Sequence, residues 1–223
     1  MLPRLNAIVD VEVAERAGWA PVDLAATYIN GGARFLQLRA KSLSGAAFLD
    51  LSTRVCEVAH RAGAIVIVND RADIARLSGA DGVHLGQDDL GPQAARAIVG
   101  HDAVIGMSTH TSVQVDLALG APVTYLAVGP VFGTSTKATG YAAVGLERVR
   151  EAAERIREPD TKSERSATPM GLVAIGGITL ETAARVIEAG ATSIAVISDL
   201  LATSDPEARV RAYLALLGET GHV

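Results

Sequence analysis

Cations and carboxylates follow short apolar runs of this 223-residue chain, in positions from which they could act on a phosphorylated molecule. Gln37, Arg39 and Lys41 alternate at the end of one run, and alternate residues of a strand lie on one face. Asp70 ends a second run and Asp89 follows a third. Cations bind phosphate oxygens, and a few carboxylates together with substrate phosphate are the usual ligands of Mg²⁺. These residues predict a site for a phosphorylated substrate and a metal ion.

A loop rich in hydroxyl groups supplies a different set of phosphate ligands. Residues 129–140 read GPVFGTSTKATG and come directly after an apolar run. The hydroxyls of Thr134, Ser135 and Thr136 can donate to phosphate oxygens together with backbone N–H groups of the loop. Lys137 adds a positive charge beside them. The loop therefore predicts an anion site.

A second anion position is predicted further along the chain. Gly176 and Gly177 precede a helix whose expected first cap is Thr179, and another helix begins after Ser198. The N-terminus of a helix binds anions through its free N–H groups and its dipole. Two anion positions imply either two phosphorylated species or one that carries a pyrophosphate.

Lysine is rare in the chain, and its positions sharpen this prediction. Only Lys41, Lys137 and Lys162 occur, and every other cationic side chain is arginine. The lysine ammonium is a compact point charge that suits phosphate. Lys41 and Lys137 lie at predicted strand ends, whereas Lys162 lies in a polar stretch where we expect it to be solvated.

Asp70 and Asp89 are predicted to face one another from neighbouring strands. Two carboxylates about 4 Å apart repel by roughly 4 kcal/mol at an effective dielectric constant of 20. A Mg²⁺ ion between them would remove that repulsion and bridge to phosphate oxygens. The alternative is that both acids pair with arginines such as Arg39 or Arg71.

Eight short apolar runs alternate with stretches that have helical spacing. The expected strands are 6–10, 34–39, 65–69, 82–85, 104–107, 124–128, 172–175 and 193–197. The clearest expected helices are 46–61, 146–157 and 180–189. This alternation predicts a single-domain (β/α)8 TIM barrel over residues 1–223, with a doubly wound open sheet as the alternative. In such a barrel the active site lies at the carboxyl ends of the strands.

Residue types at the expected helix ends agree with these boundaries. Four hydroxyl residues are expected N-caps: Ser44, Thr111, Thr179 and Ser204. A short segment that contains Gly-Ala recurs just before an expected strand, at residues 30–33, 77–80, 119–121 and 188–191. We expect each glycine to end a helix by adopting a positive φ.

The bulk composition narrows the functional classes. The formal net charge of −5 gives no electrostatic footprint for nucleic acid. The single cysteine, Cys56, excludes an internal disulfide and is expected to be buried and inert. No apolar run is long enough to span a bilayer and no signal peptide is recognisable, so we expect a soluble, cytoplasmic protein.

Three further segments receive non-catalytic interpretations. Residues 158–168, EPDTKSERSAT, are polar and lack apolar periodicity, so we expect a flexible surface insertion on the face opposite the site. His84 lies within an expected strand and His110 at an expected helix start. We expect packing and capping roles for these two histidines.

Seven motifs, in this order and spacing, resemble the thiamine phosphate synthase family. They are QLRAK, VND, GVHLGQDD, GMSTH, GPVFGTSTK, AIGGI and AVIS. Members of that family are (β/α)8 barrels. They join 4-amino-5-hydroxymethyl-2-methylpyrimidine diphosphate to hydroxyethylthiazole phosphate, release pyrophosphate and use Mg²⁺. The resemblance therefore implies an Mg²⁺-dependent transferase with small phosphorylated substrates, and it leaves a homo-oligomer open.

The resemblance also implies roles for individual residues. Those expected to hold the pyrimidine substrate are Gln37, Leu38, Arg39, Ala40, Lys41, Asn69 and Ser108. Those expected to bind the thiazole phosphate are Thr134, Ser135, Thr136, Gly177, Ile197 and Ser198. Asp70 and Asp89 would bind Mg²⁺, and Lys137 would reach the diphosphate. The catalytic set would be Arg39, Lys41, Ser108 and Lys137.

Two rival functions remain at this stage. A thiazole tautomerase would share the fold and the thiazole phosphate pocket, but an isomerase needs no pyrophosphate clamp. The presence of Lys41, Asp70, Asp89 and Lys137 together counts against it. A sensor of phosphorylated metabolites could bind its ligand without metal, whereas the synthase should form pyrophosphate only with Mg²⁺.

Overall fold

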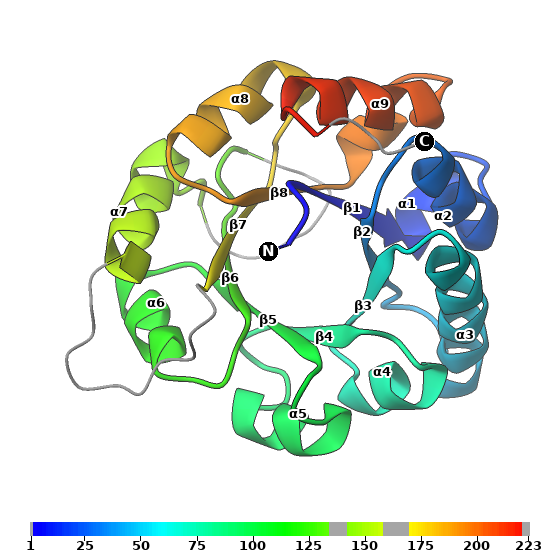
Figure 1. Ribbon diagram of the computed structural model, residues 1–223, viewed down its shortest axis with the longest axis horizontal. Coiled ribbons are helices and arrows are strands. Elements are labelled where there is room, and N and C mark those ends of the chain that lie inside the picture. Colours follow the sequence, from blue (N-terminus) through cyan, green and yellow to red (C-terminus); the bar gives the residue numbers. More distant parts are fainter. Residues whose placement is uncertain (1, 134–141, 158–169, 220–223) are drawn as a thin grey trace.

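Eight parallel strands close into a barrel in the computed structural model, which describes residues 2–133, 142–157 and 170–219 (Figure 1). In chain order they are β1 (Leu5–Asp10), β2 (Phe35–Arg39), β3 (Ile65–Asn69), β4 (Gly82–Leu85), β5 (Val104–Thr109), β6 (Tyr125–Val128), β7 (Gly171–Ile175) and β8 (Ser193–Val196). β1 pairs with both neighbours: Ala7 lies opposite Leu36 of β2 and opposite Val196 of β8. This closure confirms the predicted (β/α)8 barrel and excludes the open sheet.

Helices follow the strands and form a ring outside the barrel (Figure 1). They are α1 (Val11–Arg16), α2 (Pro21–Asn30), α3 (Gly45–Arg61), α4 (Ala72–Ser78), α5 (Pro92–Val99), α6 (Ser112–Leu119), α7 (Gly145–Arg157), α8 (Leu180–Glu188) and α9 (Pro206–Leu216), with a short 3₁₀ helix η1 (Ser198–Leu201) after β8. The expected strands and helices all occur. The largest shift is at β5, which runs on to Thr109 and so includes Ser108.

The expected N-caps are correct except at the last helix. The Ser44 and Thr111 hydroxyls accept hydrogen bonds from N–H groups in the first turns of α3 and α6, and Thr179 occupies the cap position of α8. Ser204 does not cap α9. Asp205 does, because Pro206 takes the first helical position and leaves the residue before it as the cap.

The predicted positive φ of the recurring glycines is confirmed at three of the four segments. Gly32, Gly79 and Gly190 have φ values of 102°, 73° and 109° and lie between a helix and the next strand. Gly120 is the exception, because its φ of −88° is one that any residue can adopt. α6 therefore ends without a left-handed residue.

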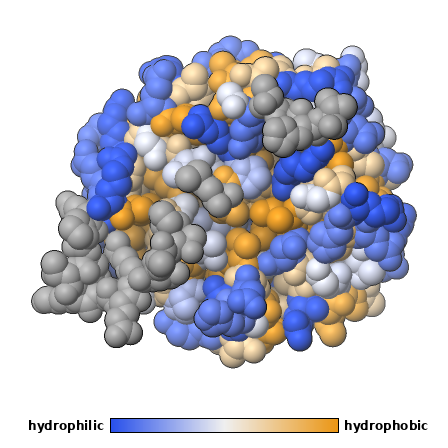
Figure 2. Space-filling view, viewed as in Figure 1, coloured by the Kyte–Doolittle hydropathy of each residue, from blue (hydrophilic) through white to orange (hydrophobic). Residues whose placement is uncertain are grey.

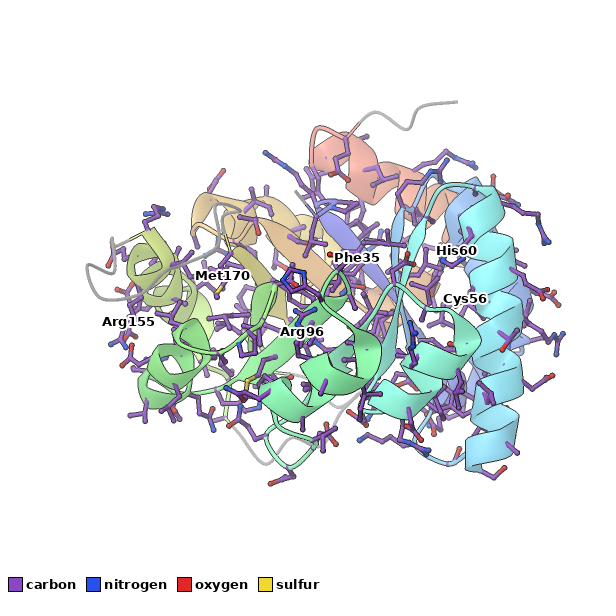
Figure 3. All side chains as sticks on the ribbon, turned by 60° about the horizontal axis from the view of Figure 1, so that its bottom comes forward. Phe35, Cys56, His60, Arg96, Arg155 and Met170 are labelled. Carbon is purple, nitrogen blue, oxygen red and sulfur yellow. The ribbon has the colours of Figure 1, made fainter. Side chains whose placement is uncertain are left out.

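Two hydrophobic clusters stabilise the fold, one on each side of the sheet. The larger lies between the barrel and its helices and includes Cys56 of α3, which is 2% exposed, as expected (Figure 3). The smaller fills the barrel interior, where the rings of Phe35 and Tyr125 meet edge to face at 6.0 Å. Because side chains fill the barrel interior, the polar groups at the carboxyl ends of the strands lie on a packed core.

The outer surface is mainly hydrophilic, with hydrophobic residues nearer the centre of the face seen in Figure 2. Among the described residues, no helix is long and apolar enough to cross a membrane. The polar segment 158–168, which was expected to be a surface insertion, lies outside the described residues. The same holds for Thr134, Ser135, Thr136 and Lys137.

Candidate active site

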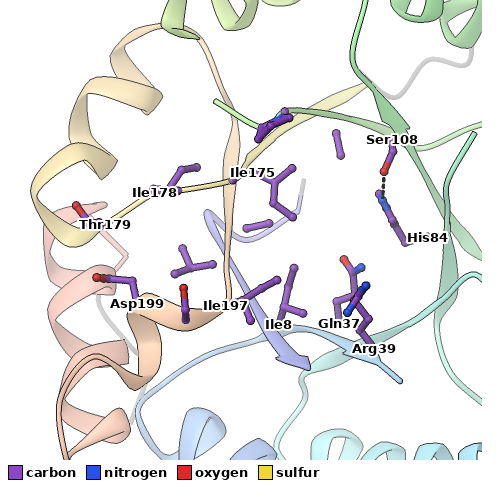
Figure 4. Close-up of a pocket in the computed structure, with 18 of the residues that line it drawn as sticks. Ile8, Gln37, Arg39, His84, Ser108, Ile175, Ile178, Thr179, Ile197 and Asp199 are labelled. Carbon is purple, nitrogen blue, oxygen red and sulfur yellow. Dashed lines mark hydrogen bonds between the residues drawn. The ribbon is translucent and has the colours of Figure 1, made fainter. Parts of the chain in front are cut away.

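A cavity of about 450 Å³ opens at the carboxyl ends of the strands, where the sequence predicted the site (Figure 4). The predicted residues that line it are Gln37, Arg39, Asn69, Ser108, Gly177, Ile197 and Ser198. Its wall differs from side to side. Figure 4 shows polar groups of Gln37, Arg39, His84 and Ser108 on one side and the isoleucines Ile8, Ile175, Ile178 and Ile197 on the other.

A chain of amides crosses the polar side. Asn6 Nδ2 donates to Gln37 Oε1 at 3.3 Å, and Gln37 Nε2 donates to Asn69 Oδ1 at 2.8 Å. All three side chains are buried, and they come from the neighbouring strands β1, β2 and β3. Because its oxygen accepts from Gln37, Asn69 keeps its amide donors for a ligand. Gln37 thus orients Asn69 as well as lining the cavity.

Arg39 is held by an acid that the sequence analysis did not assign to the site. Arg39 Nη1 forms an ion pair with Asp10 Oδ2, and the two residues lie opposite each other in the pairing of β1 with β2. The Asp10 side chain is 2% exposed, and its other oxygen accepts from the Val13 N–H and so caps α1. Arg39 Nε is buried without a hydrogen-bond partner among the described residues. The guanidinium therefore keeps donors for an anion in the cavity.

Lys41, Asp70 and Asp89 lie together at the rim, beside the cavity rather than in its wall. Lys41 Nζ forms an ion pair with Asp70 Oδ2, and Asp89 Oδ2 accepts from the Gly86 N–H at 2.7 Å. Partial burial, and next a hydrogen bond with the Asp70 carboxyl, raise the pKa of Asp89. The predicted proximity of the two acids is therefore present.

The expected alternative, that arginines neutralise both acids, is not what the described residues show. Arg39 pairs with Asp10, and Arg71 pairs with Asp73. Asp70 has a φ of 67°, the left-handed region that non-glycine residues rarely adopt. Strain of this kind is often found at functional sites, and here it accompanies a carboxylate directed at another carboxylate.

The donor set at the rim fits a divalent cation that substrate oxygens help to bind. Among the described residues, no three His, Cys, Asp or Glu side chains gather closely enough to hold a metal alone. Two facing carboxylates are nevertheless what Mg²⁺ commonly takes from a protein when substrate phosphates and water complete its shell. Partial burial and then the neighbouring Asp70 carboxyl raise the pKa of Asp89, and a cation beside both acids would favour their charged forms.

Ser108 belongs to a buried chain of hydrogen bonds on the polar side of the cavity. Its hydroxyl is 2.8 Å from His84 Nε2 (Figure 4). His84 Nδ1 is in turn 2.9 Å from the Tyr125 hydroxyl. The Tyr125 ring fits because Gly106 has no Cβ, which would come within 2.0 Å of it. His84 is buried as expected, but it also orients Ser108 through this hydrogen bond.

His110 does not have the capping role that the sequence suggested. Its Nδ1 lies 2.5 Å from the Gly129 carbonyl oxygen, and its ring lines the cavity. The helix cap is instead the neighbouring Thr111, whose hydroxyl accepts from the Gln114 N–H at 3.2 Å. His110 therefore joins the end of β5 to the loop that follows β6.

Glycines and backbone groups form the side of the site near β6, β7 and β8. The Phe132 N–H donates to the Gly176 carbonyl at 2.9 Å, so the loop after β6 is joined to the loop after β7. Gly177 has a φ of 64°, and a Cβ there would come within 2.6 Å of the Gly133 oxygen. Only glycine allows this approach without strain.

The start of η1 is fixed by Asp199, another residue that the sequence analysis missed. Its carboxylate accepts hydrogen bonds from Arg209 Nη2 at 2.8 Å, from the Leu180 N–H at 3.2 Å and from the Tyr213 hydroxyl. Asp199 thus ties η1 to α8 and α9 and holds the preceding Ser198 at the cavity. Ser198 is exposed to solvent, as a ligand-binding residue can be.

Two of the predicted binding residues can contribute only through their backbone. Leu38 is 1% exposed and packs in the cluster between the barrel and the helices, so its side chain points away from the cavity. Ala40 packs partly against the same cluster. Both were named because they lie within the QLRAK motif, and alternation along β2 explains why their side chains face outward.

A family model described as thiamine monophosphate synthase matches residues 6–200 of the chain. The chain belongs to this family. A thiamine-phosphate synthase from Koribacter versatilis is 41% identical over 218 residues, which cover 97% of this chain and 96% of the relative. One from Chlorobium luteolum is 41% identical over 204 residues, covering 90% of this chain and 89% of the relative.

A solved structure supports the same family assignment. Thiamine phosphate pyrophosphorylase from Pyrococcus furiosus superposes with a TM-score of 0.82 at 25% identity, covering 97% of this chain and 96% of that one. A 3-hexulose-6-phosphate synthase, at 18% identity and a TM-score of 0.64, shares the fold alone. For this member of the thiamine monophosphate synthase family, the resemblance seen in the seven motifs is therefore confirmed at the level of the family and its barrel.

Proposed function

We propose that the protein is a thiamine phosphate synthase. It joins 4-amino-5-hydroxymethyl-2-methylpyrimidine diphosphate to hydroxyethylthiazole phosphate or its carboxylated form and releases pyrophosphate. The observation that carries this proposal is the cluster of Lys41, Asp70 and Asp89 at the rim of a cavity that also exposes Arg39 and Asn69. Such a cluster suits a departing diphosphate better than it suits a proton transfer.

The reaction needs stabilisation of a leaving group more than it needs a strong base. The bond between the pyrimidine methylene carbon and the diphosphate oxygen breaks, and the electron pair leaves with the pyrophosphate. The thiazole nitrogen then forms the new bond to the resulting pyrimidine cation. Arg39 and Lys41 bind the departing anion in this proposal, with Lys137 as the third cation.

Asp70 and Asp89 would hold the Mg²⁺ ion. When bound, the metal supplies positive charge that stabilises the leaving diphosphate. Asn69 and Gln37 would position the diphosphate end of the substrate beside this pair. The orientation of Asn69 by Gln37 supports this role, because it leaves the Asn69 amide as a donor.

Ser108 would contact the pyrimidine ring in the interior of the cavity. Its hydroxyl already bonds to His84 Nε2, so its remaining hydrogen-bonding capacity is directed by that histidine. Arg39, Lys41, Ser108 and Lys137 form the proposed catalytic set. The QLRAK backbone, including Leu38 and Ala40, would complete the pyrimidine side.

The thiazole phosphate would bind on the opposite side. Gly177, Ile197 and Ser198 line the cavity there, and the N-terminus of η1 follows them. Thr134, Ser135 and Thr136 would add hydroxyl donors to the same phosphate. The isoleucine side chains suit the uncharged part of a heterocycle.

A thiazole tautomerase fits these observations less well. It would need neither the carboxylate pair nor the cations at the rim. A sensor without catalytic activity would need no metal between the acids. The two neighbouring carboxylates, however, are an arrangement that a bound cation would stabilise. The relatives named above also carry the synthase name.

One assay tests the proposal. The purified protein is incubated with both substrates, with and without Mg²⁺, and thiamine phosphate and pyrophosphate are measured by chromatography. We expect equal amounts of the two products and neither product without a divalent cation. Formation of an isomerised thiazole with no pyrophosphate would favour the tautomerase, and tight ligand binding without any product would favour the sensor.

A further inference from the structure

The acidic residue Glu12, in the first turn of α1, holds the turn that carries Lys41. Its Oε1 accepts three hydrogen bonds of 2.9 Å, from the Lys41 N–H, the Ser42 N–H and the Ser42 hydroxyl. No backbone-to-backbone hydrogen bond is made by residues 41–43 within the described part of the chain. Glu12 therefore supplies the hydrogen bonds that hold the backbone of residues 41 and 42.

The Glu12 carboxylate remains charged at neutral pH. Burial by itself would raise its pKa, but hydrogen bonds from its own N–H, from the Ser42 hydroxyl and from the two backbone N–H groups lower that pKa to about 2. Oε2 is buried without a hydrogen-bond partner among the described residues. A charged carboxylate with one oxygen left unpaired is a costly arrangement, so a role beyond packing is reasonable.

Asp10 adds to this restraint from the same segment. One of its oxygens caps α1 through the Val13 N–H, which fixes the helix that carries Glu12. The other oxygen pairs with Arg39. Asp10 therefore holds Arg39 by its side chain, and Glu12 holds Lys41 by its backbone N–H. The two acids lie two residues apart in the sequence, and so do the two cations.

We propose that Glu12 is a positioning residue for Lys41 in the binding of the diphosphate. Lys41 is now paired with Asp70, which the proposed function assigns to the metal. When Asp70 binds a cation, that ion pair can no longer hold the ammonium in place. Glu12 accepts its hydrogen bonds from the Lys41 N–H and from Ser42, so it holds the Lys41 backbone at the rim in both situations. The inference rests on the proposed function for the identity of the anion and for the cation at Asp70.

The test measures pyrophosphate binding by calorimetry in excess Mg²⁺, so it does not depend on turnover. Glu12→Gln should weaken binding about tenfold, because a loosened turn misplaces the lysine. Ser42→Ala removes one of the three donors and should weaken binding less. Glu15→Gln is the matched control, because Glu15 lies on the same helix and is exposed. It should bind like the wild type.

A double-mutant cycle separates positioning from a general effect on folding. If Glu12 acts through Lys41, then Glu12→Gln should add nothing to the loss caused by Lys41→Ala. A full tenfold further loss in that background would overturn the inference, as would wild-type binding by Glu12→Gln. If Glu12→Gln fails to fold, the same cycle is run with Ser42→Ala. Wild-type protein that binds no pyrophosphate would contradict the proposed function instead.

Discussion

The two sides of the cavity mouth offer different groups to the anions of the proposed function. On the side of β1 to β4, the available groups are charged side chains. Arg39 is paired with Asp10, and Lys41 is paired with Asp70. The Lys41 backbone is also bonded to Glu12. On the side of β6 to β8, the structure presents glycine backbone and the start of η1. In the proposed function the first side must exchange ion pairs when it binds a ligand, whereas the described residues of the second side offer backbone groups.

This difference separates the kinds of change to which each side responds. If the proposed exchange of ion pairs occurs, the charged side should be sensitive to the loss of a single carboxylate and to metal removal. On the glycine side, the Asp199 carboxylate lines the cavity but is already paired with Arg209, so this side should respond mainly to added volume. The predictions below test that contrast in order of decreasing effect.

Asp89→Asn should give the largest loss of activity. It removes one of two proposed metal ligands, and metal stabilisation of a leaving anion is worth several kcal/mol, so turnover should fall roughly a thousandfold. A magnesium titration of product formation measures this. Asp88→Asn is the control, because Asp88 is adjacent but exposed. An unchanged titration for Asp89→Asn would remove that residue from the metal site.

Asp10→Asn should give the largest loss of stability. Arg39 would keep its charge with its buried partner neutralised, and breaking a buried ion pair in this way costs about 3 kcal/mol. Urea denaturation measures the free energy of unfolding. Asp50→Asn is the control, because its pair with Arg54 is exposed and should contribute at most about 0.5 kcal/mol. Equal effects of the two substitutions would show that Asp10 does not hold Arg39.

Gly177→Ala should act on the other side of the mouth. Its Cβ would approach the Gly133 oxygen and Phe132 Cβ, and the φ of 64° disfavours alanine. Displacing these loops should raise the KM for the thiazole phosphate about tenfold, the size of effect that a small misplacement produces. Steady-state kinetics with each substrate varied in turn measures this. An equal rise in the KM for the pyrimidine diphosphate would contradict the division of the mouth into two sides.

The smallest expected effect is the dependence on pH of the stability that Glu12 contributes. The folded-state pKa of Glu12 is about 2, below the ordinary value of 4.5, so its contribution is fully present above pH 4.5 and is lost as pH falls toward 2. The difference in melting temperature between wild type and Glu12→Gln should therefore be constant above pH 5 and shrink in acid. Calorimetric melts at several pH values measure it. A difference in melting temperature that grows in acid would show that the pKa of Glu12 is not lowered in the folded protein.

Periodicity and residue type predicted most of the fold from the sequence. Short β-branched runs are buried on both faces in a parallel barrel, which is why every strand could be identified. The position of a polar residue at a strand end also predicted the cavity, as with Asn69 and Ser108. Ser204 and Asp205 are both good caps by residue type, and only the position of Pro206 distinguishes them.

The partners of the site residues were harder to predict. Asp10 ends a strand just as Asn69 does, and the same rule could have found it. Its pairing with Arg39 depends on the register of β1 against β2, which the sequence does not show. Glu12 contacts Lys41 across 29 residues of sequence. Contacts of this kind are made by the closed barrel and have no local signal.

The most direct test of the central claim is a crystal structure with magnesium and pyrophosphate. We predict that the metal will lie between Asp70 and Asp89, with Arg39 and Lys41 in contact with the anion and the ion pair of Lys41 with Asp70 broken. Pyrophosphate bound only near Gly177 and Ser198, with Lys41 still paired to Asp70 and no metal at the two carboxylates, would contradict the account.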